Sequence, residues 1–137
     1  MALAAMRATM TAFYQAWADA DRTAVETLVG DPFLFTSPYD APIDRAEYFR
    51  RCWPHAGNLD GGFDIQQVAP AGEDGLLVLY EARVKGGAML RNVEYLRFAG
   101  ERLRSVEVYF GLAPGAMPTT PAAWAAGQDE NARKESR

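Results

Sequence analysis

An amide and an acid stand two residues apart, at Asn92 and Glu94, in a run that alternates apolar and polar residues. Side chains two apart in a β-strand point to the same side of the sheet. That side also carries Leu90, Leu96 and Phe98, so we expect the amide and the acid to point inward. A buried acid can donate to a ligand oxygen, or it can be satisfied by neighbouring protein groups. The pattern predicts a buried polar pair in an apolar interior, but it does not indicate a reaction.

Two other ionisable residues are candidates for moving a proton beside Glu94. His55 is the only histidine, and histidine is the side chain that ordinarily titrates near neutrality. It follows Pro54 in an expected loop at the mouth of a cavity, where simple exposure would also explain it. Asp40 lies in the segment 37–42, where turn formation explains an aspartate equally well. Glu94, His55 and Asp40 are therefore the candidate catalytic residues.

Aromatic and amide side chains on the predicted inner surfaces are candidates for contacting a ligand. Each of them can instead be an ordinary core residue. The candidate ligand-binding residues are Tyr14, Trp17, Trp53, Tyr80, Asn92 and Phe110.

Composition excludes several classes of function. The 137 residues carry a formal net charge of −4, and their lysines and arginines are scattered, which argues against nucleic acid or an anionic membrane as partner. The single cysteine, Cys52, excludes an internal disulfide framework and a multi-cysteine zinc site. One histidine and scattered acids give no metal-ligand spacing, so we expect no metal and no cofactor. No stretch approaches the roughly 18 apolar residues of a membrane span, and the first ten residues lack a basic run before an apolar block, so we expect a cytoplasmic protein.

The first half of the chain reads as helices around one short strand. A helix is predicted at about 3–19 from an apolar stripe of Leu3, Met6, Met10, Phe13 and Trp17. Asp21 is expected to cap a short second helix that Gly30 stops, and a strand follows at 33–36. A third helix begins at Asp44, with Glu47 three residues later as in a capping box, and Pro54 ends it.

Four strands are predicted in the second half, at about 62–69, 76–85, 88–98 and 102–111. This order predicts an α+β fold, a curved antiparallel sheet wrapped around the N-terminal helices as a cone-shaped barrel, with a ligand cavity between the two. We expect a single domain at 1–113 and a C-terminal tail at 114–137. Trp124 would lie in a helical turn that packs on the body or on a partner subunit, or frays, and the chain beyond Gly127 is expected to be disordered.

The element order, with FYQAWADAD in the first helix, FTSPYD after the first strand and RNVEYLRF and VEVYFG in the last two strands, resembles the nuclear transport factor 2-like superfamily. Its SnoaL-like and ketosteroid-isomerase-like branch is the most similar, over about residues 5–111. The resemblance implies this α+β fold. The superfamily contains isomerases, polyketide cyclases, epoxide hydrolases, hydroxylase small subunits and proteins that only bind or scaffold, so it does not imply one activity.

Two templates of that superfamily can be laid on the residues. Ketosteroid isomerases use a tyrosine and a protonated acid as an oxyanion hole, with a second carboxylate as base. Glu94 matches the protonated acid, but Ser37 stands at the base position and Phe13, followed by Tyr14, at the tyrosine position, which disfavours that mechanism. Limonene epoxide hydrolases use an arginine and an aspartate two apart, and Asn92 with Glu94 resembles that pair with an amide in place of the guanidinium.

The register of the last hairpin decides which residue faces Glu94. A three-residue loop at 99–101 would set Glu94 opposite Val106, whereas a two- or four-residue loop would set it opposite Glu107 as an acid dyad. We favour the first register because the alternating apolar residues of the last strand require an apolar surrounding. It would place three residues in the cavity: Val106, Val108 and Phe110.

The opposite face of these strands mixes Val93, Tyr95 and Tyr109 with arginines, a composition typical of interfaces. We therefore expect a homodimer through the outer sheet face. The function that the sequence favours is a small-molecule-binding domain whose apolar pocket contains an acid and takes a small apolar molecule. The alternative is a cofactor-independent isomerase, cyclase or hydrolase acting on a small apolar carbonyl or epoxide compound.

Overall fold

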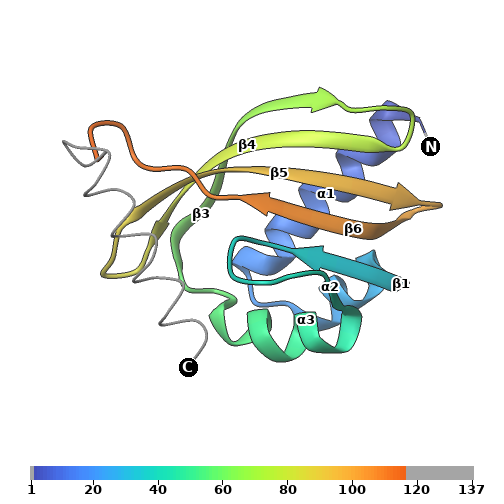
Figure 1. Cartoon of the computed structure of the whole chain (residues 1–137), viewed down its shortest axis with the longest axis horizontal. Helices are drawn as coiled ribbons and strands as arrows, with labels where there is room; N and C mark the ends of the chain where they lie inside the picture. The colour runs from blue at the N-terminus through green and yellow to red at the C-terminus, as the bar shows by residue number, and fades with distance from the viewer. Residues whose placement is uncertain (1, 117–137) are drawn as a thin grey trace.

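A computed structural model of the chain describes residues 2–116, and Figure 1 shows their arrangement. The described chain contains three α-helices, one 3₁₀ turn and six strands. Two helices come before the first strand, and the third helix and the 3₁₀ turn lie between the second and third strands. The helices are α1 (Leu3–Ala18), α2 (Arg22–Leu28) and α3 (Arg45–Cys52), with the 3₁₀ turn η1 (Trp53–His55). The strands are β1 (Val29–Thr36), β2 (Ile43–Asp44), β3 (Leu59–Pro70), β4 (Gly75–Val84), β5 (Met89–Ala99) and β6 (Arg102–Tyr109).

One sheet carries all six strands in the order β2-β1-β6-β5-β4-β3. Figure 1 shows α1 crossing one face of this sheet, with α2 and α3 gathered at its β1 end. The predicted α+β class and the sheet wrapped around helices are confirmed. The sheet is mixed rather than antiparallel throughout, because β1 pairs in parallel with β6. Residues 37–101 separate these two strands, and local sequence does not reveal which distant strand closes a sheet.

The predicted helices form behind their predicted caps, but Leu3 of the predicted apolar stripe is exposed. The Asp21 carboxylate accepts a hydrogen bond from the backbone N–H of Ala24 at 3.2 Å, and Asp44 accepts one from Glu47 at 2.9 Å. The buried stripe of α1 comprises Met6, Met10, Phe13, Tyr14 and Ala16. The expectation that Gly30 stops the second helix is wrong by two residues, since α2 ends at Leu28 and Gly30 already lies in β1.

The predicted pairing of Glu94 with Val106 is wrong. The turn between β5 and β6 holds two residues, since Ala99 pairs with Arg102, and Gly100 takes the positive φ of 62° that such a turn requires. A bulge then inserts Arg104 as one extra residue of β6, and Glu94 pairs with Val108. Because of this extra residue, Val106 and Val108 lie on the same face of the sheet as Glu94, whereas the two-residue turn alone would have placed Glu107 there. The acid dyad with Glu107 does not form.

The C-terminal tail predicted at 114–137 lies outside the described residues from 117 onward, together with Trp124 and the disorder expected beyond Gly127. Within residues 2–116, no helix has the length and apolar character needed to cross a membrane. The same part of the chain contains no group of three or more histidine, cysteine or acidic side chains that could hold a metal ion.

Candidate functional site

Glu94 lies buried in the middle of β5, and both of its carboxylate oxygens accept hydrogen bonds from tyrosines. The hydroxyl of Tyr14 donates to Oε1 at 3.0 Å, and the hydroxyl of Tyr80 donates to Oε2 at 2.6 Å. The second distance is in the range of charge-assisted O–H···O bonds. The acid is therefore held from α1 on one side and from β4 on the other.

Asn92 extends this cluster toward the end of the sheet. Its side-chain amide donates to the Tyr80 hydroxyl oxygen at 3.1 Å, and its carbonyl oxygen accepts the backbone N–H of Gly111 at 3.2 Å. The strand register explains the contact, because Tyr80 and Asn92 are direct partners across β4 and β5. Each donor in this chain of bonds points toward Glu94, which is the acceptor at its end.

Aromatic rings pack beside the acid. The ring centroids of Tyr14, Phe63 and Tyr80 lie within 4.9–5.6 Å of one another. Phe63 was not among the sequence candidates, because it reaches the cluster through a bulge that shifts β3 against β4 between Asp60 and Phe63. Its period-two position alone did not distinguish it from an ordinary core residue.

The electrostatics of the cluster follow from burial. Loss of hydration raises the pKa of Glu94 above its usual value, while the hydrogen bonds from Tyr80 and Tyr14 oppose that rise. Burial, followed by the charge of Glu94, raises the pKa of both Tyr14 and Tyr80. Burial, followed by the charge of Glu94, also raises the pKa of Tyr48 in α3, so this phenol interacts electrostatically with the acid. No arginine or lysine among residues 2–116 forms an ion pair with Glu94.

The two other catalytic candidates are bonded elsewhere or exposed. Asp40 is buried in the turn after β1, where it accepts a hydrogen bond from the Ser37 hydroxyl at 2.9 Å and forms an ion pair with Arg51 of α3. His55 is exposed and ends the 3₁₀ turn η1. Among residues 2–116, the side-chain hydrogen bonds of the Glu94 carboxylate come from Tyr14 and Tyr80 and not from Asp40 or His55.

The remaining ligand candidates lie in two places. Trp17 and Trp53 are half-buried and pack on each other with ring centroids 4.9 Å apart, on the α1 and α3 side of the acid. The inward position predicted for Phe110 is wrong: β6 ends at Tyr109, the alternation stops there, and Phe110 is half exposed with its ring edge on Tyr39.

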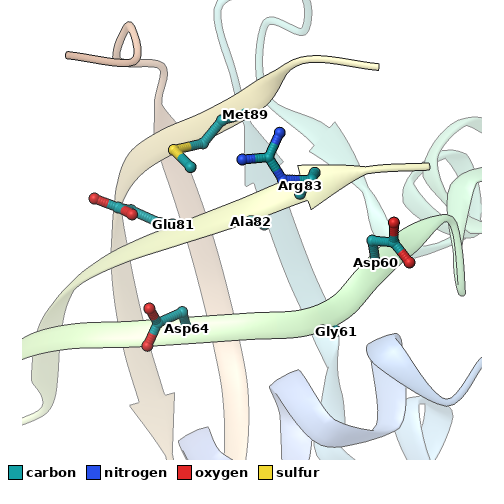
Figure 2. Close-up of a pocket in the computed structure, with 8 residues that line it drawn as sticks. Asp60, Gly61, Asp64, Glu81, Ala82, Arg83 and Met89 are labelled. Atoms are coloured by element: carbon teal, nitrogen blue, oxygen red, sulfur yellow. The ribbon is translucent and has the colours of Figure 1, made fainter. Parts of the chain in front are cut away.

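Two pockets of the described residues are lined by residues other than Glu94. One, of about 230 Å³, is lined by Asp31, Asp44, Arg45 and Ala46. The other, of about 150 Å³, lies along β3 to β5, and Figure 2 shows Asp60, Asp64, Glu81, Arg83 and Met89 around it. Glu94 lines neither of these two pockets, and its carboxylate is in contact with the hydroxyls of Tyr14 and Tyr80, on whose rings Phe63 packs.

Comparison of the sequence with protein-family models finds no match, and comparison with curated proteins finds none either. Solved structures do match. An NTF-2 like protein of unknown function from Burkholderia xenovorans superposes with a TM-score of 0.68 at 20% identity, covering 88% of this chain and 92% of that one. A SnoaL-like protein of unknown function from Burkholderia thailandensis gives 0.63 at 18% identity, over 80% and 97% of the two chains. A hypothetical protein of ketosteroid isomerase-like fold from Catenulispora acidiphila, in complex with trimethylamine, gives 0.59 at 21% identity, over 85% and 95%.

Proposed function

We propose that this chain, which has the NTF2-like, SnoaL-like and ketosteroid isomerase-like fold, is a small-molecule-binding domain anchored by Glu94. The observation that carries the proposal is the buried carboxyl group held by two tyrosine hydroxyls and flanked by aromatic rings. A buried ionisable group without an ion-pair partner lowers stability, so its presence requires an explanation beyond packing. Anchoring a ligand is such an explanation.

Counting protons indicates which ligands the cluster can hold. When Glu94 is ionised, the two tyrosine protons fill the two contacts, and no hydroxyl proton is left over. When Glu94 is neutral, three protons share the same two contacts and one is free to donate. The free proton is then that of Tyr14, of Tyr80 or of the acid itself. The partner it fits is an acceptor oxygen, such as the carbonyl or epoxide oxygen of a small apolar molecule.

A ligand needs space beside the acid, and Phe63 is the ring that can provide it. Phe63 is half-buried, whereas Tyr14 and Tyr80 are buried. It follows Gly61 and Gly62, whose φ values of 80° and 74° are open to glycine and rare for other residues. We expect ligand entry by displacement of the Phe63 ring, with Trp17 and Trp53 lining the other side.

A catalytic role is the second candidate, as a cofactor-independent isomerase, cyclase or hydrolase. The raised pKa of Glu94 favours it, because perturbed acids concentrate at active sites. Proton transfer would require a second ionisable group, and Asp40 is engaged with Ser37 and Arg51. Binding without chemistry therefore stands first. The trimethylamine complex of the Catenulispora protein supports a small organic molecule as ligand in this fold.

The experiment that tests binding is a screen of small carbonyl and epoxide compounds by thermal shift and native mass spectrometry. For a compound that binds, Tyr14→Phe should weaken affinity about tenfold, since it removes one hydrogen-bond donor and keeps the ring. Tyr109→Phe removes an exposed hydroxyl from the other face of the sheet and should leave affinity unchanged. A screen in which no compound stabilises the protein, or equal affinity in Tyr14→Phe, would contradict the proposal.

We further propose that the protein acts as a cytoplasmic homodimer joined through the outer sheet face. That face carries the exposed side chains of Leu77 and Tyr109, with the half-buried Val93 and Tyr95 between them. The Arg97 guanidinium lies 4.5 Å from the centroid of the Tyr95 ring. Aromatic and arginine side chains of this kind are enriched at protein interfaces.

A further inference from the structure

Three large apolar side chains are exposed near the end of β6, one from the turn after β1 and two from the segment that follows β6. Tyr39, Phe110 and Leu112 keep 41%, 50% and 49% of their surface accessible. The rings of Tyr39 and Phe110 meet edge to face with centroids 5.5 Å apart, and Leu112 follows two residues later. We call these three residues the strand-end patch. Apolar side chains gathered in this way, rather than scattered singly, mark an interaction surface.

The backbone that carries the patch is fixed to the sheet. The Gly111 N–H donates to Asn92, and a Cβ at position 111 would lie 2.1 Å from the backbone oxygen of Arg91, which only glycine avoids. The segment is thereby pressed onto β5 at Gly111, between Phe110 and Leu112. The backbone that carries Phe110 and Leu112 is therefore held in place by β5 and is not the frayed end of a strand.

A turn then reverses the chain beside this surface. The Ala116 N–H donates to the Ala113 carbonyl at 3.0 Å, across Pro114 and Gly115, and Gly115 has a φ of 80°. Proline at the second position and a positive φ at the third define a type II turn. The chain therefore reverses its direction between Ala113 and Ala116, directly after Leu112.

The composition of the following segment matches an apolar surface. Residues 117–127 read MPTTPAAWAAG, with no charged side chain and with Trp124 among four alanines, whereas the last ten residues carry six charges. Trp124 stands eight residues after the turn, a reach of up to about 26 Å, which is ample for a return to the patch.

We propose that the strand-end patch is the docking site of the chain's own segment 117–127, with Trp124 packed against Tyr39, Phe110 and Leu112. The turn reverses the chain just before this segment begins, and the uncharged composition of the segment matches an apolar surface, whereas we expect the charged residues 128–137 to stay in solvent. In this arrangement Phe110 contacts the chain itself, so it leaves the set of ligand-binding candidates. The docking does not depend on the small-molecule function proposed for Glu94.

Hydrogen exchange of the full-length protein, followed by mass spectrometry of the 117–127 peptide, tests this docking. We expect exchange at least about tenfold slower than in an unstructured peptide. Leu112→Ser and Trp124→Ala should each speed exchange of this peptide about fivefold, the effect of losing roughly 1 kcal/mol of packing. Leu34→Ser is the matched control, since Leu34 is 51% exposed but lies in β1, and it should change nothing in this peptide.

Three results would overturn the docking. The first is exchange of the wild-type peptide at the unstructured rate. The second is protection that Leu112→Ser leaves intact, because the segment would then lie elsewhere. The third is protection that falls on dilution, which would assign the segment to a second copy of the chain.

Discussion

The ionisation of Glu94 links the buried cluster to pH. Its pKa is raised in the folded protein, chiefly by burial, so the native state holds the proton more tightly than the unfolded chain does. By linkage, the stability that this group contributes is fully present below its unfolded pKa, near the ordinary value of 4.5. It is lost as the pH rises from there through the raised folded value.

Glu94→Gln should remove this pH dependence, because the amide does not ionise. The free energy of unfolding of the wild type, relative to Glu94→Gln, should fall as the pH is raised above 4.5, by at most about 1.4 kcal/mol for each pH unit. Urea denaturation at intervals between pH 4.5 and 8 measures it. A wild-type curve parallel to that of Glu94→Gln would show that Glu94 does not change its proton affinity on folding.

The two tyrosines of the cluster should differ in their effect on stability. Tyr80→Phe leaves two partners without their bond, Asn92 and Glu94, whereas Tyr14→Phe leaves only Glu94. We expect Tyr80→Phe to lower the free energy of unfolding by about 1–3 kcal/mol and Tyr14→Phe by less. Urea denaturation of both variants at one pH measures this order, and the reverse order would contradict the hydrogen-bond chain described here.

The sequence predicted the polar part of this site and missed part of its aromatic surroundings. Period-two alternation was sufficient to turn Asn92 and Glu94 inward, and Tyr80 with them, because one face of each strand is apolar. Phe63 packs on Tyr14 and Tyr80 through the β3 bulge, and Tyr48 comes within electrostatic range of Glu94 through the docking of α3; both depend on tertiary packing. No local pattern in a single sequence reports such contacts.

At the scale of the elements, the segment at 110–112, which follows β6, packs closely against β5. A Cβ at residue 111 would sit 2.1 Å from the Arg91 backbone oxygen, and backbone cannot move aside as a flexible side chain can. Gly111→Ala should therefore displace the segment and break its bond to Asn92, at a cost of about 1–3 kcal/mol of unfolding free energy.

Thermal and urea denaturation measure this cost, and Gly87→Ala is the matched control. A Cβ at Gly87 would lie 3.4 Å from the side chain of Val84, an ordinary contact, so that variant should stay near the wild type. Equal stability of the two variants would show that the segment at 111 is not pressed onto β5.

Elements were easier to predict than the register that joins them. Capping residues such as Asp21 and Asp44 act within one turn of helix, so their effect is visible in the local sequence. The hairpin register depends on an extra residue, Arg104, whose bulge leaves no mark in the pattern of apolar residues. The parallel pairing of β1 with β6 likewise depends on the whole chain having folded between them.

For the whole molecule, the outer sheet face is the surface on which two copies would meet. The strands present Leu77, Val93, Tyr95 and Tyr109 there, while the helices cover the other face (Figure 1). We expect light scattering after size exclusion to give the mass of a dimer at micromolar concentration. Leu77→Glu places a charge on this face and should yield a monomer, since an unpaired charge is costly to bury at an interface. Leu3→Glu, at an exposed apolar residue of α1, should remain dimeric, and a wild-type monomer would rule out the interface.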